Sequence, residues 1–261
     1  MRTIYFIQET LFNQLPIQEE ELTLLKEQIN QPLPTAFIQL LQEQNGGYLK
    51  NNCLQTTEPT RDGLEYVKIH YLLGTKANNY APSLFEQQVM RAQWELPDYF
   101  FIFAVDETQV FALDYAHLLV AKEPSIRYLD LEVMQWLTVA PTFHDFLAQL
   151  YQQEDEAISE QIFTYHQANW YLLQRQFEQT KRVLSVLEDH PDKEWYFTWI
   201  KQLAQSIHLE ERQFAANLFL TQVQFFHPTL PKQSTAVGQI LSNDSDATIR
   251  EEILAAREDW A

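Results

Sequence analysis

The sequence of 261 residues predicts an α+β domain over residues 1–152, followed by an all-α domain of helical hairpins over residues 153–261. In the first part, strand-like segments are grouped between helical ones, an order typical of an antiparallel sheet flanked by helices. In the second part helical periodicity dominates, and Gly238 is its only glycine. Hydrophobic residues make up 46% of the chain, which is enough to form packed cores.

Two helices are expected first. PIQEEELTLLKEQI, from residue 16, places Leu22 and Leu25 on one face and glutamates in the first turns, where the helix dipole favours negative charge. LPTAFIQLLQEQ, which begins at Leu33, repeats this pattern: Pro34 suits a first helical turn, and Phe37, Leu40 and Leu41 form an apolar stripe.

A glycine pair follows the second helix, in a chain that has only five glycines. A helix that stops and reverses into a strand needs a residue at positive φ, which glycine adopts without steric cost. We expect Gly46 to end the helix after Asn45, and Gly47 to let the chain pass close to its neighbour.

Strand signals come next. EYVKIHYLLG (65–74) alternates in polarity, and a short helix, SLFEQQVMRAQW, follows it. YFFIFAV and VFALDY flank residues 106–109, an arrangement that predicts a hairpin, and SIRYLDL (125–131) predicts a further strand. APTFHDFLAQLY then predicts a helix that Thr142 caps, with Asp145 completing a capping box.

The second part contains an internal repeat. Residues 174–191 and 211–228 align without gaps at an offset of 37, each with Arg-Gln-Phe near its start and His-Pro at its end. Helix pairs that repeat at about this offset and end at proline resemble tetratricopeptide repeats. A plain helical bundle with two similarly capped hairpins is the alternative. The tail from residue 242 predicts one last helix, capped by Asp246 or a neighbour.

Composition and charge limit the classes of function. The net charge of −18 repels phosphate backbones, which argues against nucleic-acid binding and favours encounter with basic partners, although simple solubility is also a sufficient reason for it. The longest apolar run, 99–105, is too short to cross a bilayer. Cys53 is the only cysteine and the N-terminus lacks a signal-peptide pattern, so we expect a cytoplasmic protein.

Residues 16–150 resemble the SUKH superfamily, whose domains occur in bacterial toxin-immunity proteins and in fungal regulators of cell-wall synthesis. The matching segments are the first acidic helix, LPTAFIQLLQEQNGGYL, YLLGT, LPDYFFIFAVDETQVFALDY and VAPTFHDFLAQL. The resemblance covers a little over half of the chain and leaves the helical tail unexplained.

The resemblance implies a binding protein that is not an enzyme. Bacterial members are often immunity proteins that block a cognate toxin, frequently a nuclease, and such toxins tend to be basic because they grip phosphates. The acidic chain fits a partner of this kind. The alternative hypothesis is a regulatory or scaffold adaptor that binds a protein or peptide through its helical repeat half.

The sequence offers no catalytic, cofactor-binding or metal-binding set. It has no HExxH motif, and the glycine pair ends a helix and lacks the Lys-Ser/Thr of a phosphate loop. His190 and His227 each precede a proline at the end of a repeat, where the helix dipole accounts for them.

For partner binding we propose one aromatic residue and a set of acids at turns and strand ends, where side chains are able to reach a partner. The competing interpretation is core packing for the tryptophan and a solvated rim for the acids. The residues are Trp94, Glu95, Asp98, Asp106, Glu107 and Asp114.

Overall fold

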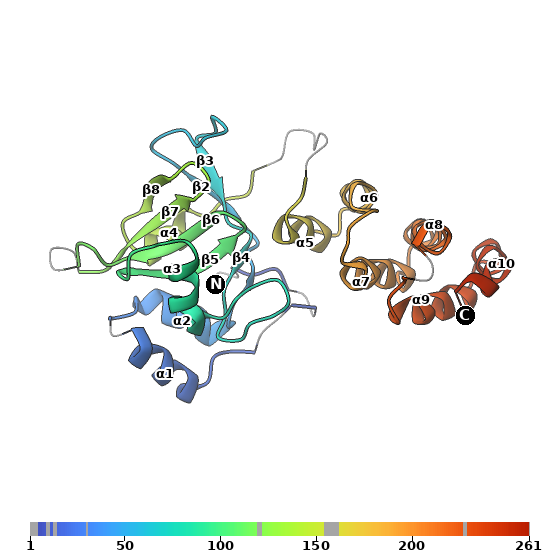
Figure 1. Cartoon of the computed structure of the whole chain (residues 1–261), viewed down its shortest axis with the longest axis horizontal. Coiled ribbons are helices and arrows are strands. Elements are labelled where there is room, and N and C mark those ends of the chain that lie inside the picture. The colour runs from blue at the N-terminus through green and yellow to red at the C-terminus, as the bar shows by residue number, and fades with distance from the viewer. Residues whose placement is uncertain are drawn as a thin grey trace. The chain divides into compact units, whose positions relative to one another are not determined.

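The computed structural model describes residues 5–8, 11–12, 15–29, 31–118, 122–153, 162–226 and 229–260 (Figure 1). The chain forms two compact units. The first consists of Met1–Ile158 and Thr164–Gln174, and the second of Ser159–Phe163 and Arg175–Ala261. The predicted boundary between residues 152 and 153 stays a prediction, because residues 154–161 lie outside the described part of the chain.

The first unit is α+β, as the sequence predicts, with small antiparallel sheets and flanking helices. Strands β1 and β4 form one two-stranded sheet, β2 and β3 form another, and β5-β6-β7-β8 form a four-stranded sheet. The helices are α1 (Glu19–Ile29), α2 (Thr35–Glu43), η1 (Leu84–Glu86), α3 (Gln87–Gln93), α4 (Phe143–Gln149) and α5 (Tyr165–Leu173). The strands are β1 (Gly47–Tyr48), β2 (Cys53–Gln55), β3 (Tyr66–Lys68), β4 (Tyr71–Leu72), β5 (Phe100–Asp106), β6 (Gln109–Asp114), β7 (Ser125–Asp130) and β8 (Gln135–Ala140).

The predicted hairpin is confirmed. Strands β5 and β6 pair from Phe100 opposite Asp114 to Asp106 opposite Gln109, and Glu107 takes a positive φ of 53° in the turn between them. Strand β7 is also confirmed, but β1, β2 and β8 were not predicted. β1 and β2 have only two and three residues, which is too short for an alternating pattern to be visible.

The expected single strand over residues 65–74 is wrong. It divides into β3, which pairs with β2, and β4, which pairs with β1. The break falls at Ile69 and His70, and both residues are buried. The segment therefore forms two short strands, each in a different two-stranded sheet, and not one long strand.

Aromatic side chains form the core between the four-stranded sheet and helices α2 and α4. The Phe37 ring contacts the rings of Phe101 and Phe143 at centroid distances of 5.9 and 4.9 Å, and Phe103 contacts Phe146 at 5.5 Å. Burying each such ring contributes about 1.5–3 kcal/mol. The predicted cap of α4 is present, since Thr142 Oγ1 accepts from the Asp145 amide at 3.1 Å. The Asp145 carboxylate, however, accepts from the Thr142 hydroxyl instead of the backbone amide that a capping box requires.

The glycine pair lies at the reversal after α2, as predicted, with φ of +87° at Gly46 and +134° at Gly47. The division of roles differs from the prediction, because α2 ends at Gln44 in an extended conformation, before either glycine. Both glycines make close approaches: a Cβ at Gly46 would lie 2.6 Å from the Gly74 nitrogen and 2.8 Å from the Leu72 oxygen, and a Cβ at Gly47 would lie 2.4 Å from Gln44 Nε2. Backbone atoms of the β4 segment thus occupy the space of a side chain.

Asn45 joins the same two segments through its side chain. Its amide nitrogen donates to Thr75 Oγ1 at 2.5 Å, and its amide oxygen accepts from the Thr75 backbone nitrogen at 3.0 Å. Asn45 is 1% exposed, so these bonds satisfy polar groups that water does not reach. The Asn-Gly-Gly motif is therefore a structural clamp between the end of α2 and the end of β4.

Helix α5 belongs to the first unit, although the sequence places it among the repeats. Seven of its nine residues are buried. The Trp170 indole donates to the Leu49 carbonyl at 2.8 Å, and the Asn169 amide donates to the Tyr48 hydroxyl at 2.7 Å. The helix begins at a capping box formed by Thr164 and Gln167.

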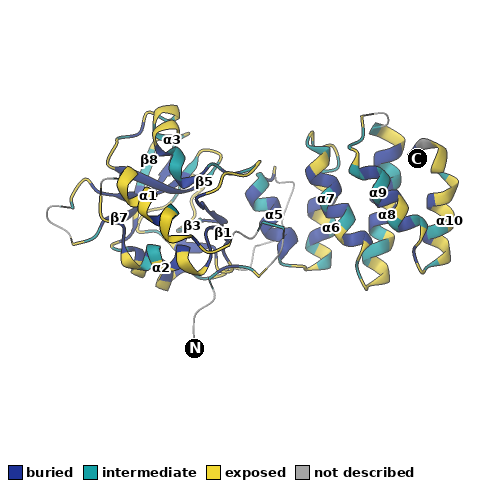
Figure 2. Ribbon diagram, turned by 90° about the horizontal axis from the view of Figure 1, so that it is seen from below, coloured by how far each residue is buried: buried dark blue, intermediate teal, exposed yellow. Residues whose placement is uncertain are grey.

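The second unit is helical, as predicted, and its buried faces are visible in Figure 2. Helix α7 packs against α8 and α9, and α9 packs against α10. The helices of the second unit are α6 (Phe177–Val186), α7 (Lys193–Ala204), α8 (Leu209–Phe226), α9 (Gln233–Ser242), α10 (Ala247–Ala255) and η2 (Arg257–Asp259). Helix α9 was not predicted. Asp246 caps α10 as expected, accepting from the Thr248 and Ile249 amides.

The two aligned segments form α6 and α8, which differ in length at 10 and 18 residues. His190 has the predicted structural surroundings: its Nδ1 accepts from the Asp192 amide at 3.1 Å. His227 lies outside the described residues. Gly238 lies within α9, where a Cβ would fall 2.4 Å from the Trp260 ring. It therefore makes room for an indole and does not interrupt the helix.

Replacing Gly46 by alanine tests the close approach of the two segments. We expect Gly46→Ala to lower the free energy of unfolding by about 2–4 kcal/mol, because it combines backbone strain with an overlap that only backbone movement relieves. Gly63→Ala is the matched control: Gly63 also has a positive φ, of +73°, but open space around its Cβ position. Urea unfolding of the three chains measures the difference, and equal losses for both variants would contradict the clamp.

Candidate protein-binding site

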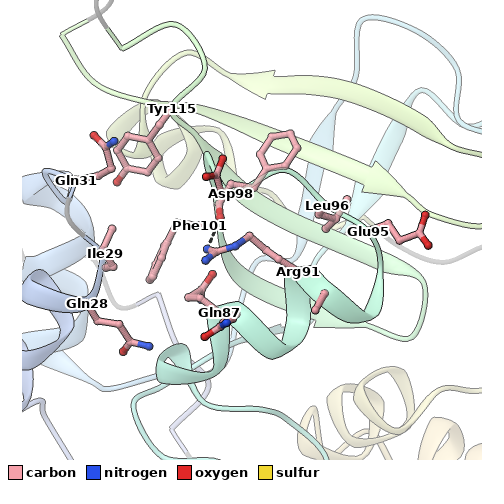
Figure 3. A pocket seen from close by; sticks show the side chains of 13 residues that line it. Gln28, Ile29, Gln31, Gln87, Arg91, Glu95, Leu96, Asp98, Phe101 and Tyr115 are labelled. Atoms are coloured by element: carbon pink, nitrogen blue, oxygen red, sulfur yellow. Dashed lines mark hydrogen bonds between the residues drawn. The ribbon is translucent and has the colours of Figure 1, made fainter.

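An open pocket of about 530 Å³ lies in the first unit between α1, α3 and the start of β5 (Figure 3). The buried rings of Phe100, Phe101 and Tyr115 form part of its lining, while Glu95 and Asp98 lie on the connection from α3 to β5. Its other lining residues are Gln28, Ile29, Gln31, Gln87, Gln88, Arg91, Ala92 and Leu96.

Helix α3 closes the outer edge of β5 at this pocket with side chains. The Gln87 amide accepts from the Ile102 nitrogen and donates to the Ile102 oxygen, both at 2.7 Å. One turn later, Arg91 Nη1 donates to the Phe100 carbonyl at 3.1 Å, the bond drawn in Figure 3. Among the described strands, β5 is an edge strand of the four-stranded sheet. The bonds from Gln87 and Arg91, together with the Leu73 amide that donates to the Phe103 carbonyl at 2.8 Å, close this edge to an added strand.

Tyr115 fixes the far wall of the pocket. Its hydroxyl donates to the Pro32 carbonyl at 3.0 Å, which ties the end of β6 to the segment between α1 and α2. Burial raises the pKa of Tyr115, with a further contribution from the charge of Glu123. The phenol therefore stays neutral and acts as a hydrogen-bond donor.

Two of the proposed contact residues line this pocket, and a third directly precedes them in the chain. Glu95 and Asp98 line it and are exposed, and Trp94 ends α3 in a half-buried position beside them. Glu95 has a positive φ of 54°, where the chain leaves the helix. The two carboxylates therefore lie where a partner is able to reach them.

Asp114 lies at the same end of the hairpin but is already paired. It is buried, accepts from Arg127 Nε and Nη2 at 3.1 and 2.8 Å, and accepts from the Ala116 amide at 2.9 Å. Its charge is neutralised inside the domain.

Asp106 and Glu107 lie at the opposite end of the β5–β6 hairpin. Glu107 is exposed in the turn, whereas Asp106 is half-buried and bonded to His70 Nδ1 at 3.1 Å. Burial by itself raises the pKa of Asp106, but the hydrogen bond and charge of His70 outweigh it, and the pKa lies below its usual range. The structure thus divides the six proposed residues between two places.

Sequence reasoning missed Gln87 and Arg91, which build the wall of the pocket. They are four residues apart on a helix that precedes an edge strand, and this spacing is the signal that could have identified them. The pocket offers hydrogen-bonding amides, two carboxylates, one guanidinium and aromatic rings. This combination suits recognition of a polar protein surface.

The closure of the β5 edge is testable by substitution. Gln87→Leu keeps the volume but leaves the Ile102 N–H and C=O without partners, so we expect a loss of about 2–4 kcal/mol in the free energy of unfolding. Gln88→Leu changes an exposed neighbour on the same helix, for which the expected change is within about 0.5 kcal/mol. Equal effects in denaturant titrations of the two variants would show that Gln87 does not stand in for a strand.

Comparisons with known proteins show which family the first unit is similar to. None of the helices in the described residues is long and apolar enough to span a bilayer. No curated protein matches the chain. A model of the SMI1/KNR4 family (SUKH-1) matches residues 16–149, from just before α1 to the end of α4. This match covers more than half of the chain and contains the clamp, the hairpin and the pocket, and the chain therefore belongs to the SMI1/KNR4 family (SUKH-1).

Proposed function

We propose that the chain is a non-enzymatic immunity protein that binds and neutralises a basic toxin of the nuclease type. Family membership supports a binding role, since SUKH domains are often immunity proteins. The observation that carries the proposal is the pairing of a −18 net charge with exposed carboxylates at the rim of an open pocket. A field of this sign accelerates encounter with a basic protein and disfavours nucleic acid.

The internal pairing of Asp114 and Asp106 narrows the contact surface. The carboxylate of Asp114 is bonded to Arg127, and that of Asp106 is bonded to His70. Glu95 and Asp98 are the proposed acids that line the pocket and are exposed. Trp94 beside them supplies an aromatic group of the type enriched at interface centres. We therefore assign the toxin contact to the end of α3 and the connection to β5.

The function is tested by protection of cells that produce a basic toxin domain of the nuclease type. The unaltered chain is expected to restore growth and to form a complex that withstands gel filtration. Absence of both protection and complex would overturn the immunity proposal.

The contact surface is tested separately. We expect the double variant Glu95→Lys/Asp98→Lys to weaken toxin binding at least tenfold, mainly through slower association, with a reduced dependence on salt. Glu58→Lys, in the exposed connection from β2 to β3, is the matched control for a single charge reversal. Surface plasmon resonance at two salt concentrations gives both rates. If both variants bind like the unaltered chain while protection persists, the contact surface lies elsewhere.

An adaptor role for the helical half is the second candidate, and the side chain of Phe225 favours it. Phe225 is 68% exposed on α8, an unusual position for a large aromatic side chain. In the same binding assay, a loss caused by Phe225→Glu but not by the Glu95/Asp98 variant would favour the adaptor.

A further inference from the structure

Helix α5 lies outside the family match, which ends at residue 149, yet a buried polar cluster connects it to the first unit. We define the α5 cluster as Tyr48 of β1, His70 before β4, Asp106 at the end of β5, and His166 and Asn169 of α5. All except Asp106 are at most 4% exposed. The proposed toxin contact, at the end of α3 and the connection to β5, uses none of these residues.

The hydrogen bonds of the α5 cluster fit a neutral His166 ring. Asn169 donates to the Tyr48 hydroxyl oxygen at 2.7 Å, and this hydroxyl lies 3.2 Å from His166 Nδ1, to which it donates when that nitrogen carries no proton. The backbone of Tyr80 forms a hydrogen bond with the same imidazole. A ring that accepts at Nδ1 and donates through its other nitrogen is neutral.

A proton on Nδ1 would remove the acceptor that the Tyr48 hydroxyl uses. The cost is not relieved by water, because His166 is 4% exposed and its ring stacks on Tyr71 at 4.9 Å and 11°. Burial of a charged imidazole adds a desolvation penalty.

The groups facing His166 come from several elements. Among the described residues, Asp106 is the anion whose attraction favours a proton on His166, but its carboxylate is engaged by His70 and by Thr164 at the start of α5. His70 opposes that proton. The phenol rings of Tyr48 and Tyr71 also contact the His166 ring.

We propose that α5 is an acid-released clasp, which is docked on the first unit while His166 is neutral and detaches when that ring takes up a proton. The sequence continues from Gln174 of α5 directly into the second unit. Detachment of α5 therefore breaks the polar bonds that hold this helix, the last segment before Arg175, to the rest of the first unit.

The direction and size of the pH effect follow from the two states of His166. Burial lowers the pKa of docked His166 to about 4, against 6.5 for an exposed imidazole. The equilibrium constant for docking of α5 is therefore highest well above pH 6.5. As the pH falls from 6.5 towards 4, this constant decreases by roughly tenfold per pH unit. From pH 7 to pH 5, the population with α5 released rises about 20-fold.

Hydrogen exchange of the full chain tests the clasp. We expect amide protection in residues 165–173, corrected for intrinsic exchange, to fall about 20-fold between pH 7 and pH 5. His166→Gln keeps a donor and an acceptor but does not titrate, so its α5 protection should be independent of pH. His144→Gln, at an exposed position of α4, should behave like the unaltered chain. An unaltered chain without pH-dependent release of α5, or a His166→Gln variant that still shows it, would overturn the proposal.

A second measurement covers the case in which His166→Gln does not fold. Imidazole NMR signals of the unaltered chain should show His166 as a neutral ring at pH 7 that titrates near 4. Titration of His166 near 6.5 would contradict the clasp, because the docked and released helix would then bind the proton equally well.

Discussion

The first unit depends on one constraint: buried backbone groups need hydrogen-bond partners, and its strands are too short to supply all of them. Side chains supply the missing hydrogen bonds at the points where strand pairing ends. Gln87 pairs with both polar groups of Ile102, Asn45 satisfies the amide of Thr75, and Trp170 satisfies the carbonyl of Leu49. Each of these side chains comes from a different helix or turn, so the same bonds that satisfy the backbone also assemble the domain.

This constraint positions the candidate binding site. Gln87 and Arg91 hold α3 against β5, and the chain then leaves α3 through Glu95 at a positive φ. Glu95 and Asp98 are consequently presented from a fixed helix end, which reduces the entropy that a partner has to remove on binding. Not every carboxylate of the chain is accessible to a partner, because some form ion pairs inside the domain, as Asp114 does with Arg127.

The sequence was sufficient for the features that depend on local periodicity and turn chemistry. It located α1, α2, the β5–β6 hairpin, the cap of α4 and the need for glycine after Asn45. It failed where tertiary pairing decides the outcome. The strand through Ile69 and His70 looks continuous, but its two ends pair with different sheets, and this depends on residues far away in the chain.

The site was predictable in the same uneven way. Exposed acids at turns were identifiable, but whether a carboxylate meets an internal cation depends on strand register, as for Asp114 opposite Ser125 and beside Arg127. The membership of α5 in the first unit was hidden for a similar reason. Its periodicity is that of any buried helix, and the polar partners that fix it, Tyr48 and Leu49, lie some 120 residues earlier.

The most direct test of the central claim is native-state hydrogen exchange at the amides of Ile102 and Thr75. Both N–H groups are bonded to a side chain, to Gln87 and Asn45 respectively, and not to a neighbouring strand. If these side chains substitute for strands, the two amides should exchange as slowly as the amides paired between β5 and β6. Exchange at the rate of exposed loop amides would show that the side-chain bonds do not hold the domain together.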